Sequence, residues 1–385
     1  MLFKKEAKAI FLVAALAVIL SYFLIFVAQP SLQAPLMNSS RNDIYTVFAE
    51  KDGYSVKNRE GIIELQAEKE AATAINYALN AVGSHGGKVF VAAGNYRIVT
   101  SLRIHSNTIL EGEGVDDANK KGFGTRLIAG KNLVGPILTN GNHQNGDFNI
   151  AIENVAFDGS RSNNSRIAES TGITLMKTTR CRIIDVAIYN CRDSGIFFGG
   201  SQGTVEAVLE RVSSRGNNYA GLQMLTQSDF HISNCEFGSN GGHGVLLSSC
   251  SSGSIIGCHI FLNNQSGIQL YNTMNMRLTG NRANHNGCSG IEIVATMQGR
   301  GDYNIVAGNE CYDNSQASNF EAGIKINPKS VNISNCLINS NICFDDQINK
   351  TQAFGIKEET GGLENLFVGN LCSNNKLEDM IVSGA

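Results

Sequence analysis

The chain has 385 residues, of which 42% are hydrophobic and 17% charged, and its net charge at pH 7 is −3. This length suffices for one large core, and the lack of a basic excess argues against nucleic-acid binding. Glycine is plentiful (41 residues) and proline scarce (4 residues), a composition typical of strands joined by tight turns.

The N-terminal segment is predicted to enter a membrane. Three lysines among the first eight residues precede an apolar run over residues 9–28, which is long enough to span a bilayer as a helix. We expect residues 1–30 to form an uncleaved anchor; a signal peptide is the alternative, although the nearest cleavage sites are poor. The lysines would stay in the cytoplasm, so the rest would be extracytoplasmic, membrane-anchored or, after cleavage, secreted. Residues 31–44 are expected to form a linker.

Residues 68–82 have a helical period. Ala71, Ile75, Ala78 and Leu79 fall on one face of this predicted helix. The segment precedes a long region without any helical period, and a stacked-repeat protein needs its open end covered. We therefore predict an N-terminal cap helix.

From about residue 150 the chain repeats one phrase, a glycine followed by alternating apolar residues. Four of the intervals between these phrases are 23 residues and the other three are 26, 33 and 32, which fits insertions in loops. A fixed period of this size indicates stacked repeats. The phrases are GITLM (172–176), GIFFG (195–199), GLQML (221–225), GVLLS (244–248), GIQLY (267–271), GIEIV (290–294), GIKIN (323–327) and GIKEE (355–359).

A second sequence motif recurs with the same period, so that similar residues from successive repeats align in columns. Stacked strands about 4.8 Å apart would fill their interior in this way, with cysteine as a small apolar filler. Scattered disulfides are the alternative reading of the cysteines. Asparagine columns indicate ladders of side-chain amides at turns. One column holds Cys235, Cys258, Asn281, Asn309, Asn341 and Asn370, and another holds Phe237, Ile260, Cys311, Cys343 and Cys372.

Each repeat holds two or three short strands and no helix, so only stacking can bury its apolar face. The stretch EKEAATAINYALNAVGSHGGKVFVAAGNYRI (68–98), followed by LRIHSNTILEGEG (102–114), resembles the entry of the pectin-lyase-like superfamily. The resemblance covers residues 45–385 and implies an all-β, single-stranded, right-handed parallel β-helix (a solenoid of PbH1 repeats). Its members include lyases, hydrolases, epimerases, tailspikes and proteins without known activity, so the fold does not define the function.

Alternation along each strand predicts which side chains face outward. The residue after each glycine should point inward, and the following one outward. In the families that the chain resembles, this outward face is the usual groove for a sugar chain. The outward columns are Thr174, Phe197, Gln223, Leu246, Gln269, Glu292, Lys325 and Lys357; then Met176, Gly199, Leu225, Ser248, Tyr271, Val294, Asn327 and Glu359; and, before each glycine, Thr171, Ser194, Ala220, His243, Ser266, Ser289, Ala322 and Phe354.

Two enzyme families share part of this pattern. Polygalacturonases are similar in Gly242-His243-Gly244 and in Gly323-Ile324-Lys325. The preceding coils SGIFFGG and YAGLQML contain no carboxylate, whereas glycoside hydrolysis needs two, so we do not expect a hydrolase. Mannuronan C5-epimerases are similar only at His243, because their other signature residues are replaced.

We predict a site of four candidate catalytic residues, His243, Tyr271, Glu292 and Lys325, which would converge within four coils, roughly 15 Å. β-Elimination from a uronic acid needs a cation at the carboxylate and a base for the C5 proton, and lysine, tyrosine or histidine can serve. Alternatively, His243 is a polar turn residue and the charges are ion-paired surface groups. The expected substrate-binding residues are Gln223, Gln269, Lys357 and Glu359.

These residues predict an extracytoplasmic protein that binds an acidic polysaccharide, and whether it also cleaves the polymer by β-elimination or otherwise modifies it stays open at this point. The alternative is a non-catalytic surface, adhesion or structural module. No cofactor is required, although Asp116-Asp117 or Asp345-Asp346 could bind Ca²⁺ with the help of carbonyl groups.

The C-terminal strand is predicted near Met380–Val382, with no helix after it. An uncovered parallel edge invites pairing. We expect the terminal strand or loop insertions to fold over this edge, or another chain to cover it, as in a homo-oligomer joined through the C-terminal coil.

Overall fold

A computed structural model describes residues 43–115, 124–131, 133–161, 170–200, 205–318 and 320–382. The predicted anchor and Asp116-Asp117 lie outside these residues. Over the described part of the chain, no helix is both long and apolar enough to span a bilayer. The first strand begins at Asp43, so the β-structure starts two residues before residue 45, where the β-helix was predicted to begin.

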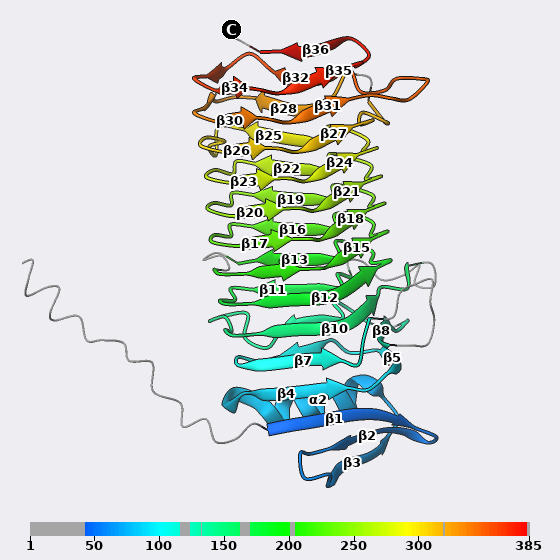
Figure 1. Ribbon diagram of the computed structural model, residues 1–385. Helices are drawn as coiled ribbons and strands as arrows, with labels where there is room; N and C mark the ends of the chain where they lie inside the picture. The colour runs from blue at the N-terminus through cyan, green and yellow to red at the C-terminus, as the bar shows by residue number, and fades with distance from the viewer. Residues whose placement is uncertain are drawn as a thin grey trace, which may run out of the picture. The chain divides into compact units, whose positions relative to one another are not determined.

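Parallel strands stack along one axis, as predicted, and each coil of the repeat region contributes one strand to an 11-stranded sheet (Figure 1). Eight of its members, β11 to β32 in the order below, coincide with the glycine-led phrases of the sequence. The members of the sheet are β6 (Leu102–Ile104), β9 (Leu138–Asn140), β11 (Ile173–Met176), β13 (Ile196–Gly199), β16 (Leu222–Leu225), β19 (Val245–Ser248), β22 (Ile268–Tyr271), β25 (Ile291–Ala295), β28 (Ala322–Pro328), β32 (Phe354–Glu358) and β36 (Glu378–Ile381).

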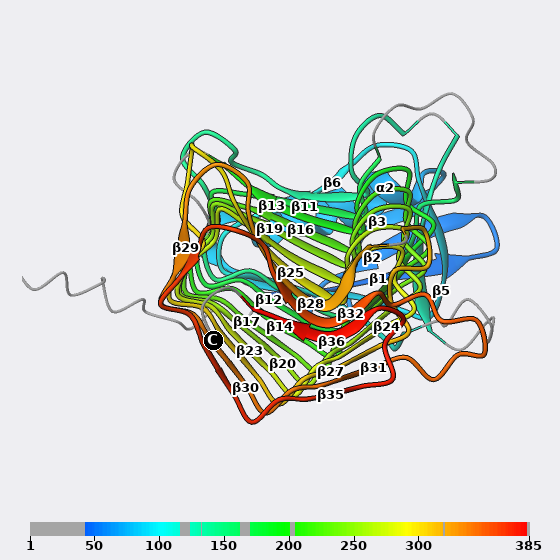
Figure 2. The ribbon, with the colours of Figure 1, turned by 90° about the horizontal axis from the view of Figure 1, so that it is seen from above.

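A 23-stranded sheet forms the other two sides of the coils (Figure 2). Its first column is β1 (Asp43–Glu50), β4 (Gly87–Val91), β7 (Thr108–Gly112), β10 (Ala151–Asp158), β12 (Arg182–Tyr189), β14 (Val208–Glu210), β17 (His231–Ser233), β20 (Ser254–Ile256), β23 (Arg277–Thr279), β26 (Ile305–Ala307), β30 (Leu337–Asn339) and β34 (Leu366–Val368).

The second column shares the long strands β10 and β12 with the first. Its other members are β5 (Gly94–Ile98), β8 (Thr125–Ala129), β15 (Ser213–Arg215), β18 (Glu236–Gly238), β21 (His259–Phe261), β24 (Arg282–Asn284), β27 (Glu310–Tyr312), β31 (Ile342–Phe344) and β35 (Leu371–Ser373). A separate pair, β29 (Ile333–Ser334) with β33 (Gly362–Leu363), joins two loops.

The core runs along the axis and is filled by the side chain that follows each glycine, as predicted. All of these side chains, for example Ile268 and Ile291, have no exposed surface. The glycine itself is required by close packing. A Cβ at Gly267 would lie 2.6 Å from the carbonyl oxygen of Gly290 in the next coil, nearer than a real Cβ can approach.

Asparagine ladders connect the coils, which confirms their prediction from the sequence. In one ladder the Asn281 side chain donates to Asn309 Oδ1 at 3.0 Å, and Asn309 donates to Asn341 Oδ1 at 3.0 Å. The oxygen of Asn309 also accepts the backbone N–H of Asn281 at 2.9 Å. Buried backbone groups at each turn thus gain partners from the neighbouring coil.

The cysteines are core filler rather than disulfides. All ten are unpaired, and eight are buried. Cys343 lies between Cys311 and Cys372 in the predicted column. Burial raises the pKa of the Cys181 and Cys250 thiols to about 11, so these two sulfurs are protonated at neutral pH.

The N-terminal cap is helical as predicted, but it starts later and includes strands that the sequence did not indicate. The helix α2 (Ala71–Val82) begins three residues after Glu68, because that residue ends a strand, and a short 3₁₀ turn, η1 (Gly83–His85), follows it. Its predicted face is buried. β2 (Gly53–Lys57) and β3 (Ile63–Glu68) extend the sheet beyond β1 in antiparallel order.

The C-terminal coil is open at its last edge. The strands β34, β35 and β36 each pair on one side only within the described residues, so no described strand lies over them. Leu366, Leu371 and Met380 are exposed there. The expectation that the chain's own terminal strand or loops fold over this edge is therefore wrong for the described residues. Coverage by another chain stays a prediction.

Candidate functional site

The outer face of the 11-stranded sheet carries the predicted columns in the predicted register. Gln269 pairs with Glu292, Glu292 with Lys325, and Lys325 with Lys357, so four polar side chains follow one another on consecutive strands. Gln223 lies two strands before Gln269 in the same column. Parallel pairing without a shift brings these residues together because each occupies the same place in its repeat.

Three of the four candidate catalytic residues are more buried than expected. His243, Glu292 and Lys325 have relative exposures of 7%, 8% and 8%, whereas Tyr271 is partly exposed. The whole column before the glycines, which includes His243, is buried and does not belong to the exposed face. The expectation of one continuous exposed face of three columns is wrong because this third column lies at the turn and packs against neighbouring coils.

Glu292 is the centre of a hydrogen-bond network. Its Oε2 accepts the Ser266 hydroxyl at 3.0 Å and the Gln269 amide at 2.8 Å, and its Oε1 accepts the Asn327 amide at 2.9 Å. Burial alone would raise the pKa of Glu292, but these three donors and the charge of Lys325 outweigh it and lower the pKa. The carboxylate is therefore ionised at neutral pH.

Lys325 lies among carboxylates. Its Nζ is 3.0 Å from Glu321 Oε2 and 3.7 Å from Glu359 Oε1. Burial would lower the pKa of Lys325, but the charges of Glu321, Glu292 and Glu359 raise it. Lys357 lies 2.9 Å from Glu359 and 4.7 Å from the centre of the Phe354 ring. These carboxylates explain how two stacked lysines are tolerated.

The His243 imidazole is neutral, and one of its two ring nitrogens has no hydrogen-bond partner among the described residues. Burial lowers its pKa, and the charge of Glu292 offsets this in part. Its Nδ1 is buried and makes no hydrogen bond to any described residue.

Tyr271 lies two strands from Asn327 in the second outward column. The structure thus brings Glu292 and Lys325 together and leaves His243 and Tyr271 at the edges of the network.

Sequence reasoning missed Glu321, which accepts from Lys325 and from the Ser289 hydroxyl at 2.9 Å. The sequence offered one signal, an acidic residue four positions before Lys325. Glu321 lies in a loop insertion, however, and therefore has no place in the repeat columns. Asn327 was placed on the face without a role. Ser194, also in these columns, donates to Gln223 Oε1 at 3.2 Å, which positions a predicted binding residue.

The second calcium candidate is a turn. Both carboxylate oxygens of Asp345 accept backbone N–H groups, from Gln347, Thr351 and Gln352. The described residues contain no group of three or more histidine, cysteine, aspartate or glutamate side chains suited to a metal ion. Asp345 therefore acts as a turn-forming acceptor here.

Removing the buried cation should destabilise the fold. We expect Lys325→Met to lower the free energy of unfolding by about 2 kcal/mol at pH 7, because it leaves ionised carboxylates without their partner. The pKa of Glu292 is lower in the folded chain than in the unfolded chain, so the ionised carboxylate stabilises the fold at neutral pH. This stabilisation is lost as the pH falls through the folded-state pKa. The difference in free energy of unfolding between the wild-type chain and Lys325→Met, measured by urea titration, should therefore shrink below pH about 4.

A matched control is Arg282→Met. Arg282 pairs with Glu310 at 2.8 Å, but both side chains are more than a third exposed. Surface pairs contribute at most about 1 kcal/mol. Equal losses in the two variants would show that the Lys325 cluster is not a buried network.

Comparisons with known proteins agree with this geometry. Residues 194–372 match the family described as "right handed beta helix region". The Azotobacter vinelandii mannuronan C-5 epimerase AlgE4 A-module has a similar structure, with a TM-score of 0.64 and 16% identity over 82% of this chain and 95% of that one. A sequence search of curated proteins finds no match.

Two further solved structures share the fold at lower identity. Tailspike protein 2 of an Escherichia coli bacteriophage has a TM-score of 0.61 and 15% identity over 83% of this chain and 45% of its own. DFA-IIIase from Arthrobacter chlorophenolicus has a TM-score of 0.56 and 12% identity over 78% of this chain and 90% of its own. The stacked parallel coils, the match of residues 194–372 to this family and these neighbours together show that the chain has the fold of a right-handed parallel β-helix.

Proposed function

We propose that the protein binds a polysaccharide along the outer face of the 11-stranded sheet. The observation that carries the proposal is the row of partly exposed polar side chains in register along the axis, with Gln223, Gln269 and Lys357 in one column. Gln223 and Gln269 are two strands apart and Gln269 and Lys357 three, so amide and ammonium groups recur at multiples of about 4.8 Å and suit the hydroxyl groups of an extended sugar chain.

Aromatic groups support the same proposal. Tyr271 is partly exposed beside the column, and the buried Phe354 ring holds the Lys357 ammonium. Side chains that combine an apolar body with a polar tip are common in binding sites. Glu359, the fourth predicted binding residue, would act through its ion pair with Lys357.

The fold gives an independent reason. The similar solved structures include a mannuronan epimerase, and the shared fold makes a carbohydrate ligand a reasonable choice. On the topology predicted from the N-terminal sequence, this face would lie outside the cytoplasm, on a membrane-anchored or secreted protein.

Binding is better supported than β-elimination. Elimination needs a cation that can neutralise the substrate carboxylate and a base that reaches the C5 proton. Lys325 already has carboxylate partners, and His243 is buried. The cluster holds the carboxylates of Glu292, Glu321 and Glu359 against two lysines. An acidic polysaccharide, as predicted from the sequence, would be held through Lys357, which is more exposed than Lys325 and has one carboxylate partner, Glu359.

The full chain, purified in detergent, tests this proposal in a binding screen. Affinity electrophoresis against polymannuronate, polygalacturonate and neutral polymers should show retardation by at least one polymer. Ultraviolet absorbance of the unsaturated product, followed in parallel, should not rise. A rise in absorbance would establish a lyase instead, and no retardation by any polymer would contradict polysaccharide binding.

A further inference from the structure

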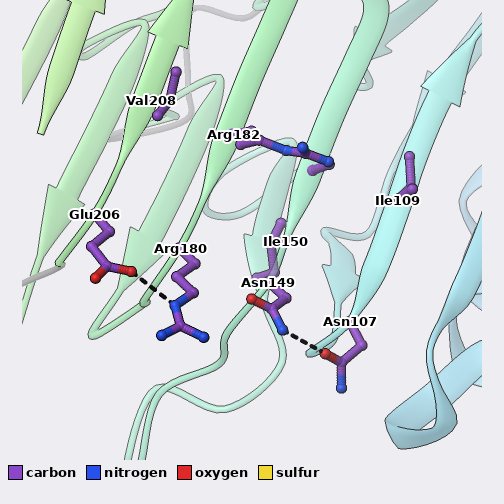
Figure 3. Close-up of a pocket in the computed structure, with 9 residues that line it drawn as sticks. Asn107, Ile109, Asn149, Ile150, Arg180, Arg182, Glu206 and Val208 are labelled. Carbon is purple, nitrogen blue, oxygen red and sulfur yellow. Dashed lines mark hydrogen bonds and ion pairs between the residues drawn. The ribbon is translucent and has the colours of Figure 1, made fainter. Parts of the chain in front are cut away.

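A pocket of about 470 Å³ lies on the 23-stranded sheet, apart from the strands that carry the candidate site (Figure 3). It is formed by the first-column strands β7, β10, β12 and β14 and by the turns that precede them. Ligand pockets in proteins commonly have volumes of about 300–1,000 Å³, so a sugar-sized molecule can enter.

The polar rim comes from one residue at the same turn of each successive coil. Asn107, Asn149, Arg180 and Glu206 all have positive φ, between 54° and 60°. This left-handed turn conformation repeats at each corner and gathers the four side chains at one edge of the sheet. Asn149 donates to Asn107 at 2.9 Å, and Arg180 donates through Nε to Glu206 at 2.8 Å (Figure 3).

The floor is hollow because a small residue stands between larger ones. Ala151 pairs with Ile109 on one side and with Arg182 on the other, and Val208 follows Arg182. The methyl group of Ala151 is shorter than all three neighbours. Ala151 itself is only 1% exposed, so the accessible apolar floor below the polar rim is formed by its larger neighbours Ile109 and Val208.

The two arginines retain unused hydrogen-bonding capacity. Among the described residues, no hydrogen bond is made by the side chain of Arg182 or by the terminal nitrogens of Arg180. The nearest carboxylate to Arg182 is Glu153, at 3.8 Å. The guanidinium group offers a planar fork of donors that fits a carboxylate or a sulfate with two parallel hydrogen bonds.

We infer that this pocket is a second carbohydrate site, which binds a sugar ring bearing an anionic group. Arg182 holds the anion, the amides of Asn107 and Asn149 contact hydroxyl groups, and the apolar floor contacts the carbon face of the ring. The inference is independent of the outer face of the 11-stranded sheet, since the two sites share no residue.

Ligand-observed nuclear magnetic resonance of the full chain tests this site with sodium glucuronate as the probe. Glucose provides the ring without the charge, and inorganic sulfate provides an anion without the ring. We expect saturable binding of glucuronate that weakens with salt, and much weaker binding of glucose and sulfate. Equal affinity for glucose or sulfate would overturn the inference.

Three variants locate the binding. Arg182→Gln should weaken glucuronate binding on the order of tenfold, because a charge-assisted fork is lost. Ala151→Leu should abolish binding without changing any charge, since the side chain fills the hollow floor. Arg277→Gln is the matched control, because Arg277 is an exposed outward arginine in the same column, at β23. Its affinity should be unchanged.

Retained affinity in Arg182→Gln and Ala151→Leu would contradict the site, as would an equal loss in Arg277→Gln. Thermal unfolding of each variant identifies any protein that fails to fold. If one of Ala151→Leu and Arg182→Gln does not fold, the other one still tests the site. Loss of glucuronate binding in these variants with unchanged polymer retardation would separate this site from the proposed function.

Discussion

Asn309→Ala is expected to lower the free energy of unfolding by about 2–4 kcal/mol. The Asn309 side chain accepts the backbone N–H of Asn281 and donates to the Leu278 carbonyl oxygen, each at 2.9 Å. Both backbone groups would lose a partner in a buried turn, and a buried unsatisfied polar group costs about 1–3 kcal/mol. Urea unfolding followed by circular dichroism measures the change.

The control for this ladder is Asn218→Ala, because Asn218 is an exposed asparagine at a turn of the same solenoid. A surface substitution normally changes stability by no more than about 0.5 kcal/mol. Asn309→Asp adds a second test, since an ionised carboxylate cannot donate to the Leu278 oxygen. Similar stability of Asn309→Ala and Asn218→Ala would contradict the structural role of the ladder.

Ile268→Ala is expected to cost about 2–5 kcal/mol, through lost burial and the cavity that remains. Ile268 has no exposed surface and lies between Val245 and Ile291 in the inward column. The coils above and below are tied by continuous strand pairing, so they cannot collapse fully into the space. The same urea titration provides the measurement.

An exposed isoleucine of the other sheet provides the comparison. Ile256 in β20 is 46% exposed, so Ile256→Ala removes the same atoms from the surface. Its expected cost is about 0.5 kcal/mol or less. If Ile268→Ala were as mild, the inward assignment of the residue after each glycine would be wrong.

Much of the fold could be predicted because the repeat encodes the register directly. Each glycine marks the start of a strand, and the same carbonyl contact that excludes a Cβ at Gly267 recurs at Gly290. Columns such as Asn281 and Asn309 then follow by counting. The antiparallel strands β2 and β3 were missed because they precede the repeat and belong to no column.

The site was predicted only in part. Register placed Glu292 beside Lys325, but alternation along a strand indicates only which side of the sheet a side chain faces. It does not show that the surrounding residues enclose it. Glu321 enters from an insertion with no place in the period. The pocket at Ala151 depends on the relative sizes of neighbours from coils far apart in sequence.

The central claim, that a sugar chain lies along the outer face of the 11-stranded sheet, is tested most directly by a double variant, Gln269→Ala with Lys357→Met. For a polymer that binds the wild-type chain, the account predicts a loss of affinity on the order of tenfold or more, with Arg277→Met unchanged. Wild-type affinity in the folded double variant would contradict it.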